Sequence, residues 1–268
     1  PQSTNLGRNA LAGAIIVNTS DPVYANEGKV RLGFGNYGQR EYKGVANINL
    51  MEGISALRLS AEHSQSDGFI DNITRNEKDY NGRENTVYRM KLLLEPTDDL
   101  KMVLSYQHLE NEYGDSRVLL GEFDKDDRKS TNDADAVFKT KADLASLNLN
   151  FKINNRWALK SISAYQDGER DRLSDTDLSA LAYGSGGGTV IQDNEDTNWS
   201  QELRLNFNSG TVRGSTGVYY TSIEAKNSQV ANNDLNLVTQ FDSFARSQNI
   251  NFPLGQFLTN PINLVPFG

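Results

Sequence analysis

The segment from Gly33 to Gly38, GFGNYG, has the G-x-G-x-x-G spacing of a dinucleotide-binding turn. Such a turn needs a buried strand before it and a helix after it, because the helix N-terminus receives the pyrophosphate. Here apolar and polar residues alternate on both sides of the motif, in VRLGF and in YKGVANINL. This period of two predicts two half-buried strands. The glycines therefore predict an antiparallel hairpin with Gly38 at positive φ, and not a nucleotide site.

Other candidate sites for chemistry are weaker. The acidic segment 124–135 lacks the glycine and the terminal glutamate of an EF-hand loop, so it is interpreted as a charged loop. The glycine-rich segment 183–189 lacks the G-K-[ST] ending of a phosphate loop. His63 and His108 stand alone at the ends of predicted strands, where packing is their expected role. The sequence predicts no enzyme activity, no resident cofactor and no metal site.

The composition restricts the class of protein. The chain has 268 residues, no cysteine and a formal net charge of −8, so nucleic acid is not an expected partner. No apolar run approaches the roughly 18 residues that a transmembrane helix needs. A transmembrane β-barrel needs no such run, because only every second residue of its strands faces lipid.

The alternating pattern of the first hairpin recurs along the chain. In 54–64, for example, Leu57 and Leu59 share one face, whereas Arg58 and Glu62 share the other. Each segment has roughly ten residues, the span of a tilted transmembrane strand. The predicted strands are 27–35, 39–50, 54–64, 86–95, 100–109, 147–153, 156–166, 199–207 and 212–223.

The connections between these segments alternate in length. Short turns follow the second, fourth, sixth and eighth strands, whereas long polar loops are predicted at 66–83, 110–142 and 173–196, and from 225 onward. An outer-membrane barrel has short periplasmic turns and long extracellular loops. The pattern therefore favours a membrane barrel, and it leaves open a passive porin-type channel or a soluble all-β binding module.

One face of the predicted strands is charged, and we expect it to line the lumen of the barrel. Candidate aromatic residues for the membrane interfaces are few. The lumen-facing charged candidates are Arg58, Glu62, Arg89, Lys91, Glu95, Glu202 and Arg204. The interface aromatics are Tyr106, Trp157, Tyr165, Trp199 and Phe207.

Residues 1–22, PQSTNLGRNALAGAIIVNTSDP, resemble the end of the plug domain of TonB-dependent outer-membrane receptors. That family's plug typically closes with a segment like G-P-Q-G-T-L-Y-G-R-N-A-x-A-G-A-I-N-I-V-T-x-x-P, directly before the first barrel strand. The segments GNYGQREYKGVANINL, ALRLSAEHSQSDGFIDN, LLLEPTDDLKMVLSY and NWSQELRLNF are also similar to early barrel strands of this family. The motif residues that match are Gly7, Arg8, Asn9, Ala12 and Gly13.

The resemblance implies an all-β fold: an antiparallel transmembrane β-barrel, of which about nine of 22 strands are present, preceded by the C-terminal end of a plug. It places the plug end at 1–26 and the N-terminal part of the barrel, with its long extracellular loops, at 27–268. A signal peptide, a TonB box and the start of the plug are expected upstream, and about 13 more strands downstream.

The resemblance also implies a function and a location. The expected function is energy-coupled uptake of a scarce nutrient, such as siderophore-bound iron, in the bacterial outer membrane. Its expected partners are outer-membrane lipid, TonB of the inner-membrane energy complex, and a small nutrient ligand whose identity stays open. Arg8 is a candidate partner for an inward carboxylate. The acidic loops disfavour an anionic ligand held by the loops alone.

Overall fold

The computed structural model describes residues 17–115, 128–178, 180 and 187–233, and this part of the chain is built from strands, turns and loops. No helix in these ranges is long and apolar enough to cross a membrane. The strands are β1 (Glu27–Phe34), β2 (Arg40–Met51), β3 (Ser55–Ser66), β4 (Asp71–Asn72), β5 (Arg83–Thr97), β6 (Leu100–Gly114), β7 (Lys129–Ser130), β8 (Val137–Lys152), β9 (Trp157–Asp175), β10 (Gly188–Asn208) and β11 (Arg213–Asn233).

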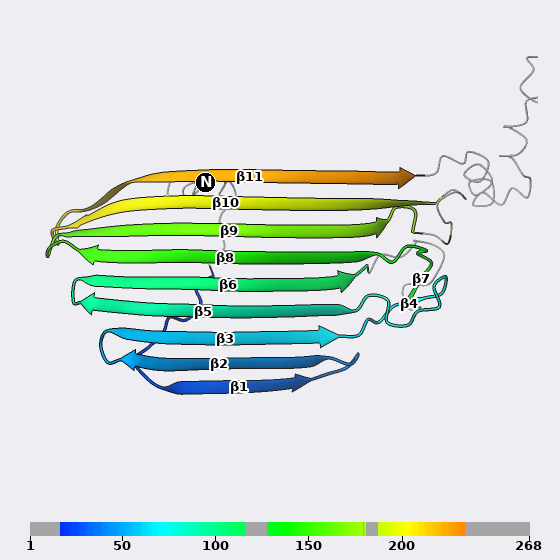
Figure 1. The fold of residues 1–268 in the computed structure, drawn as a ribbon, viewed down its shortest axis with the longest axis horizontal. Coiled ribbons are helices and arrows are strands. Elements are labelled where there is room, and N and C mark those ends of the chain that lie inside the picture. The colour runs from blue at the N-terminus through cyan, green and yellow to red at the C-terminus, as the bar shows by residue number, and fades with distance from the viewer. Residues whose placement is uncertain (1–16, 116–127, 179, 181–186, 234–268) are drawn as a thin grey trace, which may run out of the picture.

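Nine of these strands form one sheet in chain order, β1-β2-β3-β5-β6-β8-β9-β10-β11, and every neighbouring pair is antiparallel. Figure 1 shows this up-and-down arrangement, with tight turns at one end and loops that contain β4 and β7 at the other. All nine segments predicted from alternation are strands of this sheet. The predicted all-β, antiparallel fold class is therefore confirmed.

The first hairpin has the predicted reversal at Gly38, whose φ is 60°. Tyr37 also lies in the left-handed region, at φ 58°, and the Gln39 N–H donates to the Asn36 carbonyl over 3.3 Å. Two successive residues with positive φ are typical of a type I′ turn, whose twist matches the strands that it joins. GFGNYG is thus a hairpin tip.

All strands of the nine-stranded sheet except β1, which has 8 residues, are longer than the predicted ten residues, and for these strands the prediction was wrong. β9 has 19 residues, and β10 and β11 have 21 each. Residues 110–114 and 188–196, which we expected to lie in loops, continue the ladder of backbone hydrogen bonds. The alternation of apolar and polar residues marks only the part of each strand that has one apolar face. Antiparallel pairing continues beyond it, where the residues of both faces are mostly polar.

A second, parallel pair joins two of the loops. β4 pairs with β7, so that Asp71 lies opposite Lys129 and Asn72 opposite Ser130. Neither strand was predicted, because two residues are too few to show a period. The pair connects 67–82 with 128–136 at the loop end of the sheet (Figure 1).

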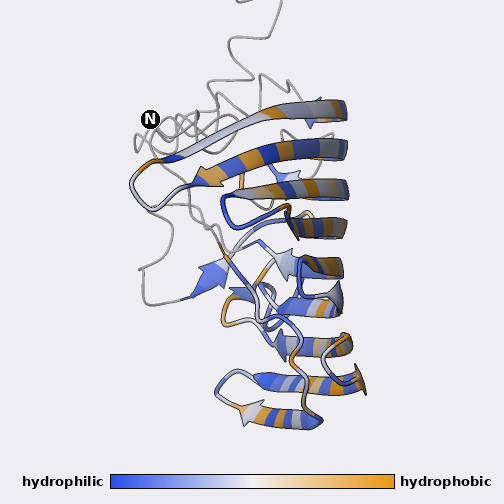
Figure 2. Ribbon diagram, turned by 90° about the vertical axis from the view of Figure 1, so that its left-hand side faces the viewer, coloured by the Kyte–Doolittle hydropathy of each residue, from blue (hydrophilic) through white to orange (hydrophobic). Residues whose placement is uncertain are grey.

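The two faces of the sheet differ, as the alternating colours along each strand in Figure 2 indicate. We call the face that contacts residues 17–26 the inner face and the opposite one the outer face. On the outer face large apolar side chains are exposed, among them Val30 at 75% and Phe34 at 74%. Arg58 and Lys91 pair directly across β3 and β5 on the inner face. Most large apolar side chains of the sheet therefore lie exposed on its outer face.

Candidate functional site

The seven charged residues predicted to face a lumen all lie on the inner face. Residues that pair directly across antiparallel strands point to the same side of a sheet. A row of direct pairs runs across the sheet from Glu202 to Leu93, through Ile162, Asn148 and Val103. Lys91 and Glu95 lie two residues on either side of Leu93 on β5, so they share this face with Glu202. That this face lines a water-filled lumen stays a prediction.

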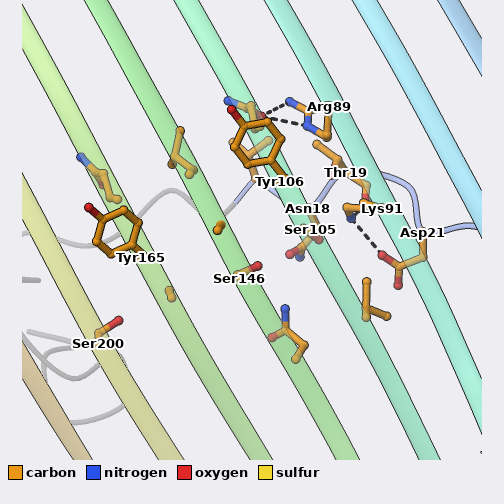
Figure 3. Close-up of a pocket in the computed structure, with 18 of the residues that line it drawn as sticks. Asn18, Thr19, Asp21, Arg89, Lys91, Ser105, Tyr106, Ser146, Tyr165 and Ser200 are labelled. Carbon is orange, nitrogen blue, oxygen red and sulfur yellow. Dashed lines mark hydrogen bonds and ion pairs between the residues drawn. The ribbon is translucent and has the colours of Figure 1, made fainter.

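Lys91 attaches the segment before β1 to the wall. Its Nζ donates to the Thr19 carbonyl over 2.8 Å and to Oδ1 of Asp21 over 2.9 Å (Figure 3). The Lys91 side chain is only 12% exposed, whereas that of Asp21 is 49% exposed. A half-exposed pair of this kind contributes little to stability. Its main effect is therefore positional.

Asn47 of β2 forms the second attachment. Its side chain is buried, and its Oδ1 accepts a hydrogen bond from the Val23 N–H over 3.0 Å. Its Nδ2 donates to the carbonyls of Val23, at 2.6 Å, and Ala25, at 2.5 Å. One amide thus satisfies three backbone groups of a segment that has no strand partner. Sequence reasoning missed this role, because Asn47 is one of several asparagines in an alternating pattern.

A small apolar cluster lies on the same face. Ala56, Leu93 and Val103 are buried, and Tyr24 packs against them. The Tyr24 hydroxyl also donates to Glu95. Leu93 and Val103 are apolar residues on the face that carries the charged side chains. This local break in the alternation is a sequence signal for where the segment before β1 docks.

The other predicted lumen residues make local pairs. Lys43 bridges Glu41, at 2.5 Å, and Glu62, at 2.9 Å. Arg58 lies 3.9 Å from Glu27, Arg204 lies 2.6 Å from Glu202, and Arg89 donates from Nε to Gln107 over 2.8 Å. These contacts hold the inner charges in defined positions.

A cavity of about 610 Å³ separates residues 17–21 from the inner face of the strands. Arg89, Lys91, Lys101 and Lys160 contribute cations to its lining, and Asp21 is its one carboxylate. Figure 3 shows the polar side chains from neighbouring strands that point into it. Its volume is in the range of small-molecule sites, which is roughly 300–1,000 Å³.

A second pocket, of about 580 Å³, lies at the loop end, and we call it the mouth pocket. Tyr37 from the hairpin tip and Phe69 from the next loop line it, with ring centroids 5.9 Å apart. The guanidinium of Arg128 lies 5.9 Å from both rings and donates to the Tyr37 hydroxyl. Positive φ at a tyrosine costs on the order of 1 kcal/mol, and such strain concentrates at functional sites.

A buried polar network holds the loops around this pocket together. Asn72, which is 1% exposed, donates to the Asn132 carbonyl over 2.7 Å. The Tyr80 hydroxyl donates to the Ala134 carbonyl over 2.6 Å. The Asp133 N–H donates to Oδ2 of Asp175, at the end of β9, over 3.2 Å. Three segments far apart in the sequence are thus fixed to one another, which holds the mouth in one arrangement.

Asp175 makes this network sensitive to pH. It lies roughly 30 Å along β9 beyond the aromatic residue Tyr165, at about 3.3 Å per residue, and hence outside the apolar band. Burial, with the neighbouring Asp177, raises the pKa of Asp175 to about 6, although N–H groups of Leu178 and Asp177 favour its ionised form. The folded network therefore binds the proton more tightly than the unfolded loops do.

We expect the loop network to lose stability as the pH rises from about 4 to about 6, since the folded-state pKa is above the ordinary one. Hydrogen-exchange protection of the Leu178 and Asp133 amides, corrected for intrinsic exchange rates, should fall over this window. Asp175→Asn should remove the dependence. Equal protection at pH 4.5 and pH 7 in the unmodified protein would contradict it.

Some predicted features lie outside the described residues. These are the plug motif residues Gly7, Arg8, Asn9, Ala12 and Gly13, residues 124–127 of the segment 124–135, and residues 183–186 of the segment 183–189. Within the described ranges, no group of three or more His, Asp or Glu side chains is placed to hold a metal ion. His63 contacts Thr86 at 3.0 Å, and His108 contacts Asp143 at 3.0 Å.

Comparison with solved structures gives consistent matches. The sheet is similar to the ferric yersiniabactin uptake receptor FyuA from Yersinia pestis, with a TM-score of 0.70 and 20% identity over 80% of this chain and 33% of that one. The ferric-catecholate import receptor Fiu from E. coli K12 gives 0.65 and 16% over 85% and 35%. The siderophore receptor PiuA from Acinetobacter baumannii gives 0.65 and 12% over 84% and 34%. No protein-family model matches the chain.

The chain spans about a third of the length of these three structures. They are uptake and import receptors, not enzymes. At identities of 20% and below, the likeness concerns the fold. The described part of this chain has the fold of the barrel wall of TonB-dependent siderophore receptors, and the resemblance in its sequence is confirmed at that level.

Proposed function

We propose that the chain is part of a TonB-dependent importer of iron chelates in the bacterial outer membrane. In this proposal residues 1–26 are the end of the plug and 27–268 the N-terminal part of the barrel. The observation that carries it is the attachment of residues 17–26 to the charged inner face through Asn47, Lys91 and Tyr24. The similarity to ferric-siderophore receptors supports the choice of cargo.

The outer face supports a location in lipid. At the depth between Trp157, which contacts Phe207 at 4.7 Å, and the row that pairs Tyr165 with Trp199, the outward side chains of β5, β6 and β8 are apolar, as in the row of Leu92, Leu104 and Leu147. Aromatic residues at both borders of an apolar band are typical of outer-membrane barrels. A soluble binding module has no reason to expose Val30, Leu32 and Phe34 side by side on one hairpin.

The segment before β1 argues against a passive porin-type channel. A passive channel keeps its lumen open, whereas here residues 17–26 cross the inner face and are held by a buried amide. Gated passage then requires energy that releases the plug. TonB is the proposed source, through a box outside this chain, and nucleic acid is not a proposed partner.

The proposal predicts uptake of an iron chelate that needs both this protein and TonB. Cells that lack their other iron receptors should accumulate radioactive iron from at least one chelate when the intact gene is expressed. Deletion of TonB should abolish this uptake and leave chelate binding at the cell surface unchanged. Equal accumulation with and without TonB would indicate a passive channel.

A further inference from the structure

The inner face of four neighbouring strands, β5, β6, β8 and β9, carries mainly cations. Its only carboxylate is Glu95, near the short-turn end. Its cations include Arg83, Arg89, Lys91, Lys160, Arg170 and Arg172. The carboxylates of β6, β8 and β9 point instead to the outer face, where their directly paired neighbours include Lys139 and Lys141. The inner face of these four strands is therefore cationic, although the whole chain has a net charge of −8.

At the loop end of this face, two arginines and two aromatic residues form one row across the strands. Direct pairs place Arg83 opposite Tyr113, Tyr113 opposite Phe138, and Phe138 opposite Arg172. The Tyr113 and Phe138 rings are parallel, with centroids 4.9 Å apart, and the Arg172 guanidinium lies 4.7 Å from the Phe138 centroid. Two guanidinium groups thus flank two stacked rings across four strands.

Neither arginine of this row is neutralised. Among the described residues no carboxylate lies within ion-pair distance of Arg83 or Arg172. Arg83 donates from Nε to the Ser66 hydroxyl over 3.0 Å, and Arg172 donates to Gln192 over 3.3 Å. The Nε of Arg172 is enclosed and has no acceptor in the described part of the chain. Both guanidinium groups keep their full charge for an incoming anion.

We propose that this row binds an anionic ferric chelate that bears aromatic rings, of the ferric tris-catecholate class. Arg83 and Tyr113 line the mouth pocket of about 580 Å³, in which Asp67 is the one lining carboxylate, and Tyr113 is 43% exposed. Phe138 and Arg172 continue the row beside this pocket on β8 and β9. Guanidinium groups bind planar anions and stack on aromatic rings, so the row offers charge and a flat surface together. The inference rests on the proposed function, because it names the cargo of the same importer.

The inner cations continue from the mouth toward the short-turn end. Arg170, which pairs with Asp196 of β10, lies two residues before Arg172 on β9, and Arg89 and Lys91 follow Arg83 on β5. Arg89, Lys91 and Lys160 line the cavity of about 610 Å³ beneath residues 17–21. A chelate that is negatively charged meets attraction along this wall, whereas a cationic one meets repulsion. The acidic outer face does not oppose entry, because it points away from this path.

The test compares three probes on the intact receptor in detergent: ferric tris-catecholate, ferric citrate and ferrioxamine. The first is anionic and aromatic, the second is anionic without rings, and the third is a hydroxamate without either property. Arg83→Gln combined with Arg172→Gln should weaken ferric tris-catecholate by about tenfold or more, since each charged hydrogen bond contributes substantially. Fluorescence quenching measures the affinity. Lys139→Gln is the matched control, because it removes a cation from the outer face next to the same row.

A separate change tests the rings. Tyr113→Leu should weaken ferric tris-catecholate binding and leave ferric citrate binding unchanged, because only the first can stack. Unchanged affinity in the double arginine variant, or ferrioxamine binding as tight as that of tris-catecholate, would overturn the inference. TonB-dependent uptake of ferrioxamine in that case would still support the proposed function. Equal accumulation with and without TonB, for every chelate that is taken up, would overturn the proposed function itself.

Discussion

Leu59→Arg should lower the free energy of unfolding by about 2–4 kcal/mol, whereas Ser60→Arg one residue further should cost less than about 1 kcal/mol. Leu59 lies on the outer face, where it pairs with Ala46 and Met90, and 39% of it is exposed. An arginine there would place its charge in hydrocarbon near the middle of the bilayer. Ser60 lies on the inner face, between Val45 and Arg89, where water and polar groups are available.

The measurement is reversible unfolding of the intact protein from phospholipid vesicles in increasing guanidinium chloride. Ser60→Arg is the matched control, because it adds the same side chain to the same strand at nearly the same depth. Equal losses at the two positions would show that the outer face is not in contact with lipid. The same result would remove the main support for an outer-membrane location.

The sheet itself was predictable from sequence because side-chain alternation and strand pairing have the same cause. A shift of the strand pairing by one residue would move Arg58 and Glu62 to the apolar face. The pattern that marks the strands therefore also sets their register. Strand length was not predictable in this way. In 192–196 both faces are polar, so no alternation remains, although the backbone ladder continues to Gly188.

The contacts of the segment before β1 and of the loops escaped prediction for a different reason. They join residues far apart in the chain, such as Asn47 with Val23 and Asn72 with Asn132, and no repeating pattern indicates which residues form these contacts. The sequence predicted that the inner face is charged, but not that the cations predominate on β5, β6, β8 and β9. The acidic composition of the loops suggested a barrier to anions, but pairing across β6, β8 and β9 places the carboxylates of these three strands on the outer face.

Asn47→Ala should release residues 17–26 from the wall and open a leak through the intact receptor. The change removes one acceptor and two donors at a site that is 2% exposed, and it leaves the Val23 N–H and the Ala25 carbonyl without their Asn47 partner, whereas the Val23 carbonyl still accepts from the Ala25 N–H over 2.8 Å. Unsatisfied buried groups cost about 1–3 kcal/mol each. The detached fraction of the segment should therefore rise by at least about tenfold.

Two measurements follow the release: proteolysis between residues 17 and 26, and entry of a small hydrophilic antibiotic into cells. Asn49→Ala is the matched control, because Asn49 shares strand and face with Asn47, but its side chain bonds Glu52 of the short turn instead. Asn47→Asp should behave like alanine, since a carboxylate lacks the donors that the two carbonyls require. If Asn47→Ala leaves both readouts at the level of Asn49→Ala, the amide does not hold the segment, and closure of the barrel must depend on other contacts such as those of Lys91 and Tyr24.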